Sequence, residues 1–329
     1  ATVFGQTPSA QRFWRHVARK HNEQSSGGRR GHVHPVDQGA RHRRRDRRDG
    51  PFRAGQAPRR HQREPRCLVA GVPGAAEQAG GLDDVAALAV GPGGGDNAMA
   101  SLGLSMGVGD VSISLGTSGV AAAISPVPAY DMTASVTGFA DCTGHWLPLA
   151  CTINGSRISD AGRAALGVGY DELAELAAAA EPGAGGITLV PYFDGERTPN
   201  RPDATAALYG MTLANTRREN IARAFVEGLL CSQRDCLELV KGLGVDVKRI
   251  LLIGGGTKFA AVRALAPAIL GMDVELPETD EHVAIGAARQ AAWVLSGETE
   301  PPTWPVKVET TLTGEPTPQV YEQYVRWRG

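Results

Sequence analysis

Long apolar runs, cysteines and aromatic residues are all scarce in this chain of 329 residues. No stretch of about 18 or more apolar residues occurs, so we expect no membrane span, and no charged-then-apolar leader opens the sequence. The five cysteines lack CxxC spacing, which argues against a disulfide scaffold or a zinc site and predicts a cytoplasmic setting. The chain begins with Ala1 rather than Met, so we expect it to be a fragment.

Charge is unevenly divided along the chain. Residues 1–70 hold 17 Lys and Arg against five acidic residues, a net of +12, and the remainder has a net of −13. The run RHRRRDRR at 41–48 lies among Gly, Pro, His and Gln, a composition that predicts disorder over residues 1–76. Such an arm favours non-specific binding to nucleic acid. Its aromatic residues are few, so we predict no specific nucleic-acid partner.

Periodic apolar segments begin only after Glu77, and they alternate between β and α patterns. This alternation predicts an α/β domain. Residues 85–90 suit a short strand or a helix end, and a small-residue helix follows the glycine-rich loop near residue 95. Asn215 and Thr216 are expected to cap the longest helix. The predicted strands are 111–125 (two segments joined by a turn at 116–119), 186–193, 249–253 and 273–276; the predicted helices are 220–240, 259–270 and 282–295.

Two glycine turns, LGTSG at 115–119 and IGGGT at 253–257, each follow an apolar β segment. Glycines there let backbone N–H groups approach an anion, and a helix that starts after Gly256 would add its dipole. Neither turn matches GxGxxG or GxxxxGK[ST], so the alternative interpretation is an ordinary tight turn.

Three further features have both a chemical and a structural interpretation. Asp96 in GGGDNA is a candidate proton acceptor, and capping of the following helix is the alternative. The segment DGERTP at 194–199 is expected to be a solvated loop with an Arg–carboxylate pair. Cys231 and Cys236 lie five residues apart on one predicted helix, where core packing is favoured over reactivity.

The order of these motifs carries more information than any one of them. GGGDNA, SLGTSG, PYFDGERTP, GMTL, a long helix and LLIGGGTK follow one another between residues 77 and 297. In this order they resemble the FGGY carbohydrate kinases. GERTPNRPDA and ACTINGSRISDAGRAALGV are most similar to the bacterial xylulokinases of that family. Phe225 and Phe259 depart from the family pattern, in which smaller residues are usual.

The resemblance implies an actin-like, ribonuclease-H-like kinase that transfers the ATP γ-phosphoryl group to the 5-hydroxyl of D-xylulose with Mg²⁺. Asp96 would be the general base. The β- and γ-phosphates would lie against Gly116, Thr117 and Ser118, and the α-phosphate and adenosine against Gly254, Gly255 and Gly256. The Mg²⁺ ligands are unknown, because the family motif that supplies them is not readable here. Another pentulose or a polyol is an alternative substrate.

The first part of the chain suggests a frameshift. GC-rich codons for VDTSTQSTKALVIDAAT, a first hairpin of the family type, give GHVHPVDQGARHRRRD when they are read from the third base, and this is residues 31–46. We therefore hypothesise that residues 27–73 are read out of frame, with the frame regained near Glu77 and a deletion after Gly91. Sequencing of the coding DNA would test this.

The expected organisation has four parts. Residues 1–76 form the basic segment, 77–112 hold residual pieces of the first kinase domain, 113–297 form the C-terminal kinase domain, and 298–329 are a tail. If the first domain is scrambled, the chain is an inactive kinase, and the alternatives are a nucleotide-binding remnant or a basic-arm nucleic-acid-binding protein. The oligomeric state is open, and a homodimer is one option.

Overall fold

The structure is a computed structural model, and it describes residues 91–329. The predictions for the basic arm, the out-of-frame segment and residues 85–90 lie outside the described residues.

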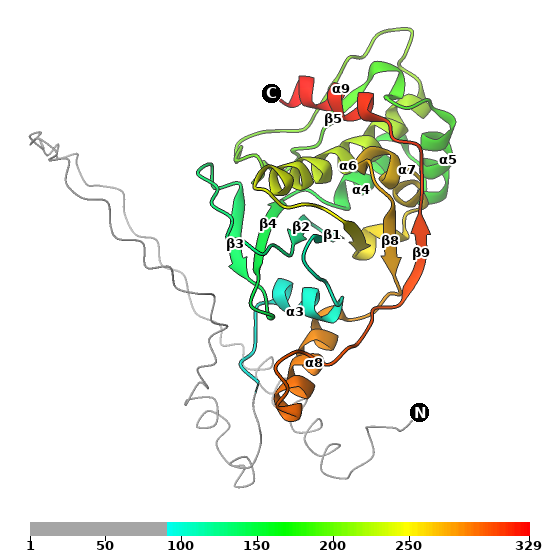
Figure 1. Cartoon of the computed structure of the whole chain (residues 1–329). Helices are drawn as coiled ribbons and strands as arrows, with labels where there is room; N and C mark the ends of the chain where they lie inside the picture. The colour runs from blue at the N-terminus through cyan, green and yellow to red at the C-terminus, as the bar shows by residue number, and fades with distance from the viewer. Residues whose placement is uncertain (1–90) are drawn as a thin grey trace, which may run out of the picture. The chain divides into compact units, whose positions relative to one another are not determined.

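A seven-stranded mixed sheet lies at the centre of the described region (Figure 1). Its order is β3-β4-β2-β1-β7-β8-β9. Strand β7 is parallel to both of its neighbours, β1 and β8. The other pairs, β1–β2, β2–β4, β3–β4 and β8–β9, are antiparallel. The strands are β1 (Asp110–Leu115), β2 (Gly119–Ala123), β3 (Val136–Ala140), β4 (Trp146–Thr152), β7 (Arg249–Ile253), β8 (Val274–Pro277) and β9 (Val308–Leu312).

The hairpin of β1 and β2 confirms the prediction for residues 111–125. Val111, Ile113 and Leu115 all face the larger core and are 0% exposed, as period-two alternation requires. Ser112 and Ser114 therefore point to the opposite face of the sheet. The turn between the strands spans residues 116–118, so the predicted glycine turn is also confirmed.

Five helices cover the face that carries the larger core: α4 (Arg157–Leu166), α5 (Tyr170–Ala179), α6 (Arg218–Gly242), α7 (Ala260–Leu270) and α9 (Pro318–Arg328). The longest of them, α6, is buried along most of its length, with Leu229 and Leu230 at 0% exposure. The predicted helix 220–240 is confirmed. Its predicted caps are wrong, because Arg217 occupies the N-cap and makes no side-chain cap bond. Asn215 instead bonds to Thr212 within the preceding turn.

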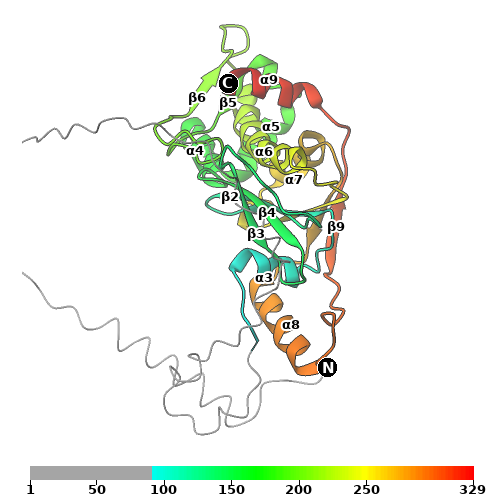
Figure 2. The same cartoon turned by 60° about the vertical axis from the view of Figure 1, so that its left-hand side comes forward.

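On the other face, α3 (Asp96–Gly103) packs through Met99 and Leu102 against the sheet, and α8 (His282–Ser296) packs on α3 (Figure 2). Glycines allow the two backbones to approach closely. A Cβ on Gly286 would lie 1.8 Å from the carbonyl oxygen of Met99, and one on Gly103 would lie 2.0 Å from that of His282. Only glycine fits at these two positions, so a larger residue at either one would push α3 and α8 apart.

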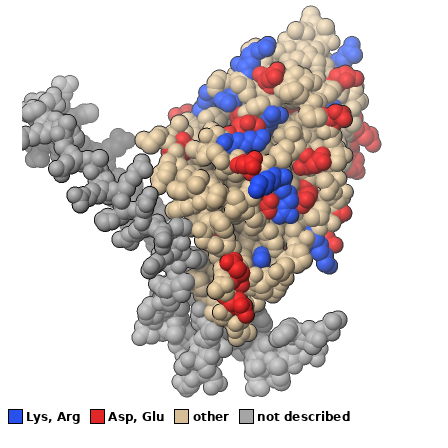
Figure 3. Space-filling view, in the orientation of Figure 1, with Lys and Arg blue, Asp and Glu red and all other residues tan. Residues whose placement is uncertain are grey.

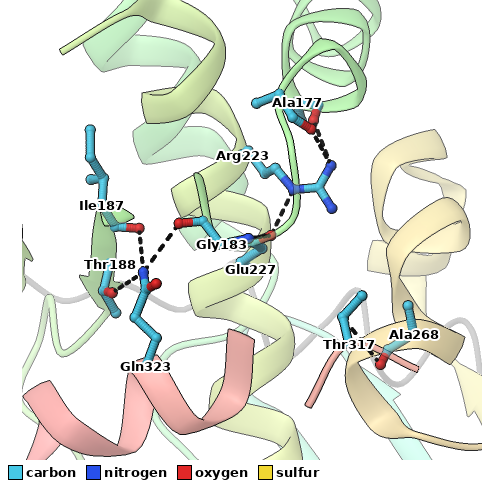
Figure 4. Close-up of polar contacts among 10 residues, drawn as sticks. Ala177, Gly183, Ile187, Thr188, Arg223, Glu227, Ala268, Thr317 and Gln323 are labelled. Carbon is cyan, nitrogen blue, oxygen red and sulfur yellow. Dashed lines mark hydrogen bonds and ion pairs between the residues drawn. The ribbon is translucent and has the colours of Figure 1, made fainter. Parts of the chain in front are cut away.

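Residues 298–329 complete the sheet and its helical cover. Strand β9 pairs with β8 at the sheet edge, and α9 packs on α6 and on β5 (Thr188–Val190), which pairs with β6 (Ala207–Tyr209). Figure 4 shows Gln323 of α9 donating to the carbonyl oxygens of Gly183 and Ile187. Glu227 of α6 accepts the N–H of Gly183 at 3.0 Å and pairs with Arg223 at 2.6 Å. The turn at residue 183 is thus held by two helices.

Charges on the described part of the chain are mixed in sign. Residues 91–329 hold 27 acidic and 17 basic side chains. Figure 3 shows blue and red side chains interspersed on the upper part of one face. None of the helices within residues 91–329 combines the length and the apolar character that crossing a bilayer requires.

Candidate functional site at two adjacent glycine turns

The two predicted glycine turns lie side by side. Ser114 of β1 is the register partner of Ile253 of the parallel strand β7, so both turns follow the carboxyl ends of neighbouring central strands. Gly254 has φ of 93°, and a Cβ built on it would lie 2.7 Å from the carbonyl oxygen of Leu115. Ligands of open α/β sheets bind at the carboxyl ends of parallel strands. The sequence predicted each turn but could not show that they touch.

The first turn rests on the segment that follows β4. Its Gly116 carbonyl accepts the N–H of Ser156 at 2.8 Å, and the N–H of Gly119 donates to the Thr152 hydroxyl at 3.0 Å. Thr117 and Ser118 at its tip are exposed. Hydroxyl and backbone N–H groups in a tight turn of this kind can donate to an anion.

The second turn continues as a short 3₁₀ helix, η3 (Gly255–Lys258), before α7 begins at Ala260. The predicted helix 259–270 is confirmed, although a 3₁₀ turn separates it from the glycines. Thr257 closes the turn by donating its hydroxyl to the Gly254 carbonyl at 2.8 Å. The exposed Lys258 supplies a positive charge at the end of η3.

A cleft of about 400 Å³ runs from the second turn to the N-terminus of α3. Asp96, Ser112, Ser114, Gly254 and Lys258 are among its lining residues. Asp96 is exposed and is the first residue of α3. Its Oδ1 accepts the N–H of the adjacent Asn97 at 2.8 Å, while Gly95 occupies the N-cap. The carboxylate therefore faces the cleft from within the first helical turn and does not act as an N-cap.

A second pocket of about 390 Å³ adjoins the cleft, since Gly255 and Lys258 line both. Tyr170 and Phe259 form one wall, with ring centroids 5.3 Å apart in an edge-to-face arrangement. Ser156 and Gly256 also line it. An apolar wall with a few polar groups is the usual character of a small-molecule site. Phe259, which departs from the family pattern, is part of this wall.

The segment DGERTP is more buried than predicted. Asp194 pairs with Arg157 of α4 at 3.0 Å, and not with Arg197 of its own loop. Glu196 and Thr198, however, are only 1% and 2% exposed, so the expectation of a solvated loop is wrong. The loop returns into the core because Glu196 finds backbone N–H donors there.

Cys231 and Cys236 are 1% and 0% exposed, and burial raises the pKa of both thiols well above the usual value. The core-packing prediction for these cysteines is confirmed. Across residues 91–329, no three His, Cys, Asp or Glu side chains gather in a way that could hold a metal ion. Mg²⁺ commonly binds through one or two carboxylates together with substrate phosphates, and such a site needs no dedicated protein cage.

The model of the FGGY family of carbohydrate kinases, C-terminal domain, matches residues 111–295. The chain belongs to this family. It is 41% identical over 210 residues to the xylulose kinase of Streptomyces coelicolor, covering 64% of this chain and 42% of that protein. The xylulose kinase of Haemophilus influenzae is 35% identical over 212 residues, which are 64% of this chain and 43% of that protein.

The crystal structure of xylulose kinase from Bifidobacterium adolescentis superposes with a TM-score of 0.71 at 76% identity, over 73% of this chain and 47% of that one. The FGGY kinase fold expected from the sequence is therefore confirmed. The chain spans less than half the length of these curated relatives.

Sequence reasoning missed several residues that line this candidate site. Ser112 and Ser114 were detectable, since alternation along β1 directs them away from the core. Lys258 directly follows the glycine turn, which was a second available signal. Tyr170 could not be foreseen, because only the packing of α5 on α7 brings it to Phe259.

Proposed function

We propose that this chain is the nucleotide-binding part of an ATP-dependent xylulose kinase. The observation that supports this most directly is the contact between the two glycine turns at the carboxyl ends of β1 and β7, with Asp96 across the adjoining cleft. In this assignment Gly116, Thr117 and Ser118 hold the β- and γ-phosphates. Gly254, Gly255 and Gly256 lie along the α-phosphate and the nucleoside. The names of the relatives supply the sugar, xylulose, and the family resemblance implies its D form.

The proposed chemistry is an in-line phosphoryl transfer. Asp96 accepts the proton of the sugar 5-hydroxyl, whose oxygen attacks the γ-phosphorus. The bond between the γ-phosphorus and the bridging oxygen breaks, and ADP leaves with that oxygen. Positioning and charge neutralisation provide most of the acceleration in such reactions. Lys258, which lines both pockets, would offset the phosphate charge. The nucleoside would enter the pocket beside Tyr170 and Phe259.

Magnesium would arrive with ATP. The carboxylates that line the cleft belong to Asp96, Asp280 and Glu281, and the described residues form no dedicated metal cage. Mg²⁺ bound to nucleotide phosphates neutralises part of their charge. The N–H groups of the two turns would then position the phosphates, together with the hydroxyls of Thr117 and Ser118.

The test is ADP release from MgATP by the purified chain, with and without D-xylulose, beside an Asp96→Asn variant. Asp96 is exposed, so the variant should keep its fold. Loss of a general base lowers the rate by about 10²–10⁴-fold. Xylulose-dependent release that the variant abolishes would support a working kinase site. Equal release by both proteins would contradict the role of Asp96.

Calorimetric titration with MgADP separates binding from catalysis. ADP binding without sugar-dependent release would support the second candidate, a nucleotide-binding remnant. Release with another pentulose or a polyol, but not with D-xylulose, would revise the substrate. Absence of ADP binding would contradict the proposed function as a whole.

A further inference from the structure

We propose that Glu196 is a positioning residue for the first phosphate turn, a role that rests on the proposed function. It is an acidic side chain that is only 1% exposed. Its carboxylate accepts the N–H of Ile153 at 2.6 Å, the N–H of Arg197 at 2.8 Å and the side-chain Nδ2 of Asn154 at 2.9 Å. A buried carboxylate requires such donors, and here each of them comes from the backbone or from a buried amide.

These donors belong to the segment on which the turn rests. Ile153 and Asn154 follow β4 directly, and two residues further Ser156 donates its N–H to the carbonyl of Gly116. A Cβ on Gly155 would lie 2.6 Å from the same Gly116 oxygen, so the two backbones are in contact. Glu196 therefore sets the position of the support, and the support sets the position of the turn.

A second chain of bonds reaches the other end of the turn. The Asn154 carbonyl accepts the hydroxyl of Thr152 at 2.7 Å, and that hydroxyl accepts the N–H of Gly119 at 3.0 Å. Gln233 of α6 also donates to Thr152, at 3.2 Å. Gly116 and Gly119 are thus both held by residues 152–156. Glu196 is the buried charged group to which this segment is bonded.

Both carboxylate oxygens of Glu196 are acceptors in this environment, since each of the three groups bonded to them is a donor. A glutamine of nearly the same shape would place an NH₂ group against the Nδ2 of Asn154. The amide of Asn154 cannot rotate without loss, since its Nδ2 also donates to the Gly195 carbonyl at 2.7 Å and its Oδ1 accepts the Asp194 N–H at 3.3 Å. Glu196→Gln would therefore displace residues 153–156 while retaining side-chain volume.

The experiment compares Glu196→Gln with Glu227→Gln in the full chain. Glu227 is the matched control, because it is only 4% exposed and accepts a backbone N–H, yet it bonds to Gly183 and Arg223, away from both turns. MgADP affinity is measured by calorimetry, and unfolding is followed by denaturant. Glu196→Gln should weaken ADP binding about tenfold, while Glu227→Gln should leave the ADP affinity at the wild-type value.

Hydrogen exchange supplies a readout that a general stability role would not give. Peptides that contain residues 116–119 should exchange faster in Glu196→Gln than in the wild type. In Glu227→Gln they should exchange at the wild-type rate. Should Glu196→Gln fail to fold, Asn154→Ala tests the same connection, because it removes the amide that bridges Glu196 and Gly195. It should weaken ADP binding in the same direction.

The outcomes separate the two proposals. If the wild type binds ADP and neither Glu196→Gln nor Asn154→Ala weakens that binding, the positioning role alone is overturned. Equal weakening in Glu196→Gln and Glu227→Gln would also overturn it, since a loss of general stability would then account for the effect. A wild-type chain without ADP affinity would overturn the proposed function, and the positioning role with it.

Discussion

Adding a single methyl group at Gly254 should destabilise the chain much more than the same change at Gly255. Gly254 has φ of 93° and ψ of 168°, a conformation that is nearly confined to glycine and costs other residues about 1–3 kcal/mol. Its new Cβ would also lie 2.7 Å from the carbonyl oxygen of Leu115 and 3.0 Å from its nitrogen. Both contacts are with backbone atoms, which can move only by displacing β1, at a further cost of about 1–3 kcal/mol.

We therefore expect Gly254→Ala to lower the free energy of unfolding by about 2–6 kcal/mol, which corresponds to a fall in the thermal midpoint on the order of 10 °C for a region of this size. Gly255→Ala has nothing within 4 Å of its Cβ and no left-handed φ. Its expected change is within about 1 kcal/mol. The assay is denaturant unfolding followed by circular dichroism. Equal losses in the two variants would refute the steric reasoning.

Two other predictions concern stability. Trp327→Ala removes a ring that stacks on Tyr209 with centroids 4.9 Å apart, and should cost about 1 kcal/mol beyond lost burial in the same assay, whereas Trp327→Phe should recover part of it. Burial raises the pKa of Glu227 above its ordinary 4.5, although Gly183 and Arg223 partly oppose the shift. The folded chain then binds this proton more tightly than the unfolded chain, so this contribution is complete below pH 4.5 and declines as pH rises through the raised value. The stability difference between wild type and Glu227→Gln should fall over that range, and a constant difference would contradict the buried titration.

Local patterns were sufficient for much of the fold. The alternation of Val111, Ile113 and Leu115 predicts β1 with its buried face, and the apolar spacing around Leu229 predicts α6. Strands β3 and β6 were not predicted, and no bounds were predicted for β4 or β9. The burial of β9 is slight because it is an edge strand, and four of its five residues are exposed, so it has no apolar pattern to detect.

The candidate site was predictable in parts. Glycine-rich turns after apolar strands are a local signal, and so is Asp96 before a helix. Their proximity depends on the parallel pairing of β1 with β7, which are separated by more than 130 residues. Glu196 was misjudged because charged residues in a loop are usually solvated. Only the fold shows that the N–H groups of residues 153 and 197 surround it.

The segment that matches the family and the segment that folds as one unit are not the same, because β9 and α9 follow the family match and pack with the rest of the fold. The family match ends at residue 295, whereas Tyr324 is 1% exposed within the same core as β1 and α6. A protein trimmed to residues 111–295 would leave β8 as an open edge and empty the space that Tyr324 fills. Open edges pair with other chains, so such a product should aggregate. Expression boundaries for this chain are thus better chosen from sheet pairing than from sequence similarity.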